Sequence, residues 1–361
     1  MKRSTAALAL AAVVLTGPAV GAQELASRLF LAADRDHDRV LTRAELEATL
    51  ESWAAVAPDA FADAIEGALP RLPQNQTPKP EDVAAMVAAL PDKAPAKPKQ
   101  ARRVLVLGRA AGFVHSSIPL ASRTIEEMGK KTGAWTATTT YNAADINEQN
   151  LKQYDAIFLS STTGHFLDDP ADTAATEARR KALLDFVRGG KGLAGIHAAS
   201  DSYHGTACAQ PMASAGEPLW PEFNKMIGGY FKFHWNNPQL ITVKIDDPKS
   251  PLTAMFNGQE FEIHDETYVL ANDSFSRANV HVLTSVNYDK MSEADKAKER
   301  NPRPDHDYAL SWIRPEGKGR LFYEAHGHDE SIYAMRPMLE HVLAGIQYAL
   351  GDLKADDKPG K

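Results

Sequence analysis

Histidine is concentrated in one part of this sequence. Eleven of the twelve histidines follow residue 102, and several stand beside glycine or aromatic residues in short motifs. An imidazole titrates near neutral pH, so it can transfer a proton or ligate a metal ion. Carboxylates accompany two of the histidines: Asp201 follows His197 by four residues, and Glu266 follows His264 by two. Acid–base chemistry and transition-metal binding are therefore both open.

A second chemical pattern lies near the N-terminus, in the stretch DRDHDRVLTRAE at residues 34–45. Three short carboxylates can wrap one side of a hard cation while a longer glutamate closes the other side, and this spacing is similar to the EF-hand calcium loop. An acidic turn with chance spacing is the less favoured interpretation. The expected ligands are Asp34, Asp36, Asp38, the backbone carbonyl of Val40, Thr42 and Glu45.

The loop departs from the EF-hand pattern at Arg39, where glycine normally supplies a left-handed backbone. A side chain at that position costs about 1 kcal/mol. We expect calcium affinity in the extracellular range, on the order of 10⁻⁴ to 10⁻³ M. Residues 70–81 resemble a second loop without acidic ligands, which predicts an EF-hand pair over residues 23–90. The degenerate second loop favours a stabilising role for calcium over a sensing role.

The first 22 residues are typical of a secretory signal. Lys2 and Arg3 precede an apolar run, and small residues lead to an expected cleavage after Ala22. The run is shorter than the ~20 residues of a membrane span, which disfavours an anchor. We therefore expect a periplasmic or secreted protein without stable membrane insertion. Cys208 is the only cysteine, so no intrachain disulfide can form, and the net charge of −7 argues against nucleic-acid binding.

After a Pro- and Lys-rich stretch at 91–102, expected to be a linker, the pattern changes. Short apolar runs alternate with amphipathic segments, which predicts a parallel sheet covered by helices on both faces. Ligands gather at the carboxyl ends of the strands in such sheets. Expected strands cover 103–108, 134–140, 154–161 and the run from 191 into the turn at 201, and expected helices cover 117–128 and 178–190.

Five ordered motifs resemble the trehalose-utilisation (ThuA-like) family: HSSIP, GKGLAGIHAASD, GGYFKFHW, IHDETYVL and ALSWIRPEGKGRLFYEAHGH. The resemblance implies a flavodoxin-like doubly wound α/β domain, similar to class I glutamine amidotransferases, over 103–352, with a polar tail at 353–361. In those relatives a strand–turn–helix elbow presents a cysteine nucleophile. His197 stands at the matching position, so glutaminase chemistry is not expected.

The resemblance also implies sugar metabolism and the handling of oxidised (3-keto) glycosides. We expect one pocket, in which either two histidines act as base and acid or three hold a divalent transition metal. The alternative is a sugar-binding or scaffolding protein without catalysis. The expected partner is a small carbohydrate, and the oligomeric state stays open. The expected pocket residues are His115, His197, His234, His264 and His328, with Asp201 and Glu266 orienting or assisting.

Overall fold

The computed structural model describes residues 74, 76–205, 217–299 and 301–360. The chain divides into two compact units, Met1–Leu72 and Pro73–Lys361. The expected signal at 1–22, the calcium loop at 34–45 and Cys208 lie outside the described residues. Among the described residues, no helix is both long and apolar enough to cross a membrane.

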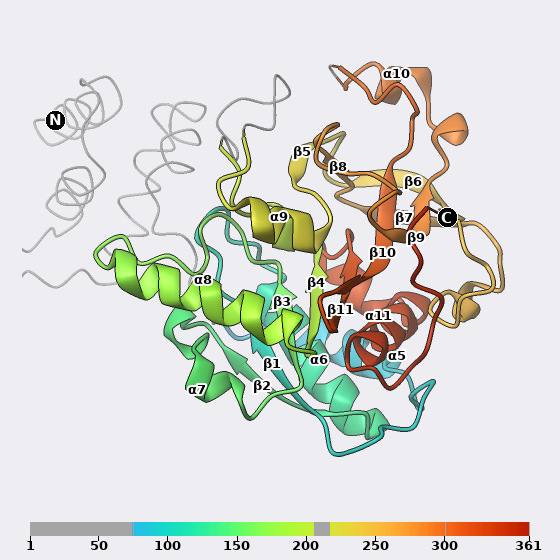
Figure 1. Ribbon diagram of the computed structural model, residues 1–361. Coiled ribbons are helices and arrows are strands. Elements are labelled where there is room, and N and C mark those ends of the chain that lie inside the picture. Colours follow the sequence, from blue (N-terminus) through green and yellow to red (C-terminus); the bar gives the residue numbers. More distant parts are fainter. Residues whose placement is uncertain (1–73, 75, 206–216, 300, 361) are drawn as a thin grey trace, which may run out of the picture. The chain divides into compact units, whose positions relative to one another are not determined.

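The second unit is built on a nine-stranded sheet in the order β2-β1-β3-β4-β11-β10-β9-β6-β7 (Figure 1). The pairings from β2 to β11 are parallel, and the pairings from β11 to β7 are antiparallel. The expected doubly wound α/β class is confirmed, and the antiparallel half extends it. The strands are β1 Arg103–Leu107, β2 Thr136–Thr140, β3 Ala156–Ser160, β4 Gly192–Ile196, β6 Gln239–Ile245, β7 Phe261–Asp265, β9 His281–Val286, β10 Ala309–Glu316 and β11 Gly319–Glu324.

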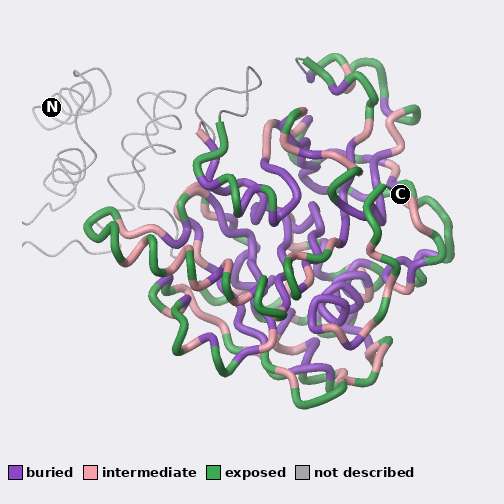
Figure 2. Tube along the Cα trace, viewed as in Figure 1, coloured by how far each residue is buried: buried purple, intermediate pink, exposed green. Residues whose placement is uncertain are grey.

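Alternation along the parallel strands creates two hydrophobic layers, because successive side chains point to opposite faces of a sheet. In β1, Leu105 and Leu107 join the layer that contains helices α8 and α9, whereas Val104 and Val106 join the layer that contains α5, α6 and α11. Both layers lie in the buried interior (Figure 2). The helices are α5 Pro80–Ala89, α6 Ile118–Thr132, α7 Glu148–Leu151, α8 Thr173–Arg188, α9 Pro221–Ile227, α10 Glu293–Lys296 and α11 Arg336–Ala349.

Two of the predicted helices are longer than expected, and local chemistry explains their ends. Helix α6 continues to Thr132 and stops where Gly133 adopts a left-handed backbone with φ of 67°. Helix α8 begins at Thr173 because the Asp172 side chain accepts a hydrogen bond from the backbone N–H of Ala175 at 2.9 Å. These caps fix the helix ends that apolar periodicity alone did not locate.

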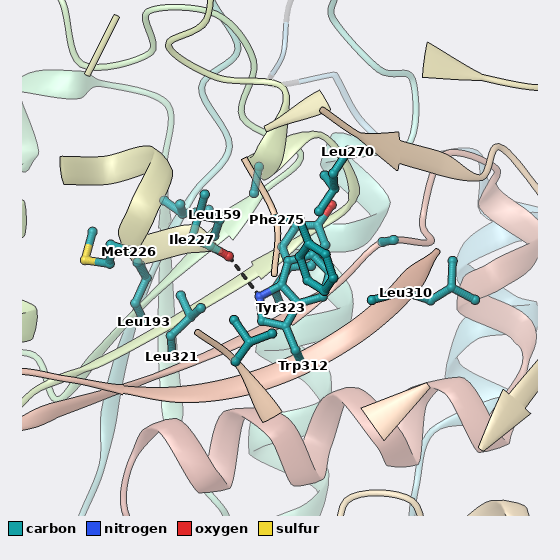
Figure 3. Close-up of a cluster of buried hydrophobic side chains, with 14 of the residues drawn as sticks. Leu159, Leu193, Met226, Ile227, Leu270, Phe275, Leu310, Trp312, Leu321 and Tyr323 are labelled. Carbon is teal, nitrogen blue, oxygen red and sulfur yellow. Dashed lines mark hydrogen bonds between the residues drawn. The ribbon is translucent and has the colours of Figure 1, made fainter. Parts of the chain in front are cut away.

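A buried tryptophan organises the centre of the sheet. Trp312 of β10 has no solvent exposure, and its ring stacks on Tyr323 of β11 with centroids 4.4 Å apart. Its indole N–H donates to the carbonyl oxygen of Ile227 at 2.9 Å, as the dashed line in Figure 3 shows. A side chain at Gly228 would collide with the same indole. This contact fixes the end of α9 against the strands.

The stretch at 91–102 has no regular helix or strand, but it is bound to the α/β unit. The backbone N–H of Ala96 donates to Gln347 Oε1 at 2.9 Å, and the Arg102 guanidinium pairs with Asp352. Helix α5, which the sequence grouped with residues 23–90, contacts α6 and the segment 330–334, and its Met86 is buried. The compact unit therefore starts before this helix, at Pro73.

A small two-stranded sheet stands beside the strand ends of the large one. Strands β5 Phe231–His234 and β8 Tyr268–Leu270 pair antiparallel. The turn between β7 and β8 contains Glu266. Short 3-10 helices complete the unit: η1 Ala143–Asp145, η2 His197–Ser200, η3 Ala254–Phe256, η4 Tyr288–Lys290 and η5 Glu330–Ala334.

Candidate metal centre

The ends of four strands bring three histidines and one glutamate together. His115 lies in the loop between β1 and α6, and His197 directly follows β4. His328 follows β11, and Glu266 follows β7. Because β1, β4 and β11 run parallel, their carboxyl ends meet at one edge of the sheet, where open α/β sheets bind their ligands.

The potential donor atoms of these four residues all lie within 4.8 Å of one another. The Nε2 atoms of His115 and His197 are 3.2 Å apart. Glu266 Oε2 is 3.3 Å from His197 Nε2 and 3.2 Å from His328 Nδ1. Donors bound to one ion at about 2.0–2.1 Å are separated by roughly 3.0–3.4 Å. The buried cluster therefore has the donor spacing of a site that could hold a metal ion.

His197 has an orientation suited to ligation. Its Nδ1 is 2.9 Å from the carbonyl oxygen of Ala325, which can only accept a hydrogen bond. The proton of a neutral ring is therefore on Nδ1, and the Nε2 lone pair faces the cluster. The residue occupies the expected elbow with φ of 47°, a left-handed conformation uncommon for a side chain other than glycine. Its carbonyl oxygen accepts from the Tyr323 hydroxyl at 2.7 Å, which helps to hold this backbone.

Asp265 positions the loop that carries His328. Its buried carboxylate accepts backbone N–H bonds from Gly327 at 2.6 Å, from His328 at 3.3 Å and from Asp329 at 2.8 Å. The Gly327 carbonyl oxygen is held in turn by the hydroxyls of Ser117 and Tyr333, both at 2.9 Å. Glu266 is next in sequence to Asp265. These two neighbours therefore supply one potential metal ligand, Glu266, and the carboxylate that holds the loop of another, His328.

The surroundings of the cluster shift the pKa values of three of its side chains. Burial lowers the pKa of His115 well below its ordinary value, and the neighbouring His197 and His328 lower it further. Burial alone would raise the pKa of Glu266, but the adjacent imidazoles of His197 and His328 hold it below its usual range. A neutral His115 and an ionised Glu266 are the forms that ligate metals. Burial opposes the charged form of His328, yet the Glu266 carboxylate raises its pKa overall.

His234 lies on the outer side of the cluster. Its Nε2 is 3.3 Å from the second carboxylate oxygen of Glu266, and 39% of its side chain is exposed. Asn237 is also exposed, and its amide nitrogen lies 2.8 Å from His328 Nε2. Glu266 thus has one oxygen toward His197 and His328 and the other toward the accessible imidazole of His234.

The two other expected pocket residues lie apart from the donor atoms. Asp201 is buried and pairs with His204, whose Nε2 is 2.7 Å from Asp201 Oδ1. Burial raises the pKa of Asp201 above its ordinary value. His264 is an exposed residue of β7 and pairs in register with Leu240 of β6. Neither residue belongs to the group of donor atoms: Asp201 is buried beside His204, and His264 lies on the surface.

Several contributors were not singled out from the sequence. Phe113 packs its ring edge-on against His115, with centroids 4.8 Å apart, and Tyr268 packs against His197 at 4.2 Å. Asp265 holds the backbone of the loop at 327–329, and the Ala325 carbonyl oxygen orients the His197 ring. The only sequence signal was position: Asp265 adjoins Glu266, and Phe113 stands two residues before His115.

This fold and site define a flavodoxin-like α/β protein with a histidine-rich candidate metal centre at its strand ends. The profile of the trehalose-utilisation (ThuA) family matches residues 103–349, and the chain belongs to that family. A ThuA-like protein from Bacteroides uniformis shares 19% identity and a TM-score of 0.53, over 72% of this chain and 96% of its own. Another ThuA-like protein, from Parabacteroides merdae, shares 14% identity and a TM-score of 0.47, over 72% of this chain and 93% of its own. No curated protein sequence matches the chain significantly.

Proposed function

We propose that this protein is a metal-dependent enzyme that acts on oxidised (3-keto) glycosides. The observation that carries the proposal is the convergence of His115, His197, Glu266 and His328 within 4.8 Å of one another. Imidazole and carboxylate donors suit zinc and other divalent transition metals rather than calcium. Membership of the trehalose-utilisation family supports a carbohydrate substrate.

The reaction that these groups suit is β-elimination next to a ketone. A base removes the proton from C2, the electron pair of that C–H bond forms the C1=C2 double bond, and the C1–O glycosidic bond breaks. The departing oxygen takes a proton from an acid, so no oxidant or reductant is required. A bound divalent metal would supply polarisation of the keto oxygen.

His234 is the residue that we assign to proton transfer. It is accessible, and its Nε2 contacts Glu266 at 3.3 Å. A catalytic zinc ion needs an open position. His115, His197 and His328 would hold the ion, and Glu266 would either complete this set or act with His234 in proton transfer. Asp201 is buried and paired with His204, so we assign it a structural role beside the cluster.

The test combines elemental analysis with product analysis. The purified full chain is loaded with zinc, dialysed, and incubated with 3-ketotrehalose, and the release of free glucose is measured by chromatography. The proposal predicts one tightly held transition metal per chain and glucose release that stops after chelation. A protein that binds the sugar but releases nothing would instead be a binding protein. Release that persists in metal-free protein would assign the reaction to acid–base catalysis by histidine alone.

We also propose that the protein is exported and that loop 34–45 binds calcium. Both proposals rest on the sequence, through the signal-like run at 1–22 and the spacing of Asp34, Asp36 and Asp38. Calcium in this loop would stabilise the N-terminal part of the chain and take no part in the reaction. Cleavage after Ala22, detected by N-terminal sequencing of protein from the periplasm or medium, tests the export.

A further inference from the structure

Phe113 is an exposed aromatic side chain directly beside the candidate metal centre. Its exposure is 51%, and no other Phe, Tyr or Trp within the described ranges is classed as exposed. The ring lies edge-on to His115 with centroids 4.8 Å apart, and its plane is inclined 24° to that of His328 at 6.4 Å. The most exposed aromatic side chain within the described ranges therefore adjoins the cluster.

The loop that carries Phe113 is held firmly in place. The Thr163 hydroxyl donates to the Phe113 carbonyl oxygen at 2.7 Å and accepts from the backbone N–H of Gly112 at 3.0 Å. The backbone N–H of Ala111 donates to the Thr163 carbonyl oxygen at 2.9 Å. A Cβ atom on Gly112 would meet Thr163 at 2.8 Å, so the two loops approach closely only because residue 112 is glycine. The exposed ring is therefore presented by a fixed backbone.

The surroundings of the ring restrict what could cover it. A protein partner would need roughly 800 Å² of surface on this side, far more than one phenyl ring supplies. Stacking of a single-stranded nucleic acid requires a positively charged groove, whereas this chain has a net charge of −7. Polar side chains reach the solvent at the same cluster: His234 contacts Glu266, and Asn237 contacts His328, whose ring is one of the two that neighbour Phe113. An aromatic face next to hydrogen-bonding groups suits a ligand with one apolar face and a polar rim.

We propose that Phe113 is the platform on which a pyranose ring of the substrate stacks, so that the sugar's edge meets the histidine cluster. The C–H groups on one face of a pyranose carry partial positive charge, and the face of a phenyl ring is negative. The hydroxyl groups at the sugar's edge can hydrogen-bond to His234 and Asn237. This inference rests on the proposed function for the choice of sugar, but its contact is separate from the metal.

The contact is tested by ligand-observed NMR titration of the zinc-loaded full chain with trehalose and with 3-ketotrehalose. Phe113→Ala should weaken binding of the sugar that binds the wild type by about tenfold, the scale of one aromatic contact. Phe113→Trp should restore it, because the indole also offers an aromatic face. Val87→Ala removes another exposed apolar side chain, from helix α5, and should leave binding unchanged. Mannitol, an acyclic polyol without a ring face, should bind no differently to Phe113→Ala and wild type.

The inference is overturned if Phe113→Ala binds as tightly as the wild type, or if neither sugar binds the wild type. Zinc content measured on the same samples distinguishes failure of the stacking contact from failure of the proposed metal-dependent function. Protein without tightly held metal whose sugar binding still depends on Phe113 would refute the metal proposal and support the stacking contact. Metal-loaded protein whose sugar binding ignores Phe113 would refute the stacking contact alone.

Discussion

The imidazole of His197 donates from Nδ1 to the carbonyl oxygen of Ala325 across 2.9 Å. This bond joins the ends of the neighbouring parallel strands β4 and β11, and it leaves the Nε2 lone pair directed at His115 and Glu266. Metal-ligating histidines are commonly fixed in this way by a backbone acceptor on the other ring nitrogen. The proton on His197 Nδ1 thus leaves Nε2 free to bind a metal ion, which supports the interpretation of the cluster as a metal centre.

Removal of one imidazole from the cluster should abolish tight metal binding. We expect His197→Ala to weaken zinc affinity by more than about 100-fold, since loss of a ligand exceeds the 10–100-fold cost of losing an outer partner. Competition with a chromophoric chelator measures the affinity. His264→Ala is the matched control, because His264 is exposed on β7, outside the group of donor atoms. Equal zinc affinity in the two variants would count against ligation by His197.

Asp265 should act on metal binding without touching the metal. Asp265→Asn keeps the size of the side chain but replaces one acceptor oxygen with a donor, so the three N–H bonds to residues 327–329 cannot all persist. We expect about 10–100-fold weaker zinc binding and a loss of about 1–3 kcal/mol in the free energy of unfolding. Glu262→Gln, at an exposed position of the same strand, should change neither quantity. Unchanged zinc affinity in Asp265→Asn would show that the loop does not depend on this carboxylate.

The free energy of unfolding should depend on pH through the buried Glu324. Burial alone would raise its pKa, but hydrogen bonds from His326 and His341 lower it from 4.5 to about 2. A lowered pKa in the folded state means that the stabilisation is complete above pH 4.5 and declines as the pH falls toward 2. Glu324→Gln should therefore cost about 3 kcal/mol near pH 5. Urea unfolding of metal-free protein gives this quantity, and the deficit relative to wild type should shrink as the pH falls. A deficit that grows toward low pH would reverse the assigned sign.

Calcium binding by the N-terminal loop should improve when its unusual residue is replaced. Arg39→Gly restores the glycine that the sixth loop position normally requires, and about 1 kcal/mol of relief corresponds to roughly fivefold tighter binding. Isothermal titration with calcium measures the change, and Asp34→Ala should remove the binding. Binding that survives in Asp34→Ala would place the calcium elsewhere.

The sequence was informative about this fold where residues act locally. The apolar runs located β1, β3 and β4, and the placement of His115, His197 and His328 after strands indicated a shared edge of the sheet. Glu266 entered as an assistant to the histidines, although its carboxylate lies at the centre of the cluster. Whether a side chain at the end of a strand points inward depends on the pairing of that strand, which the sequence does not display.

His264 illustrates this limit. It lies two residues from Glu266 in the same motif, but alternation along β7 turns it to the exposed face while Asp265 is buried. The start of helix α8 depends on a single cap, the side chain of Asp172. The packing of α5 depends on contacts with residues far away in the sequence. The position of Phe113 beside the cluster could not be predicted from the sequence either, because it follows from neighbours in space rather than from a pattern in its own segment.

The most direct test of the metal centre is an anomalous-diffraction map from crystals of the full chain loaded with zinc, collected on both sides of the zinc absorption edge. We expect one strong peak, about 2.0–2.2 Å from His115 Nε2, His197 Nε2, His328 Nδ1 and a carboxylate oxygen of Glu266. A map without a peak among these four side chains, at full zinc loading, would contradict it.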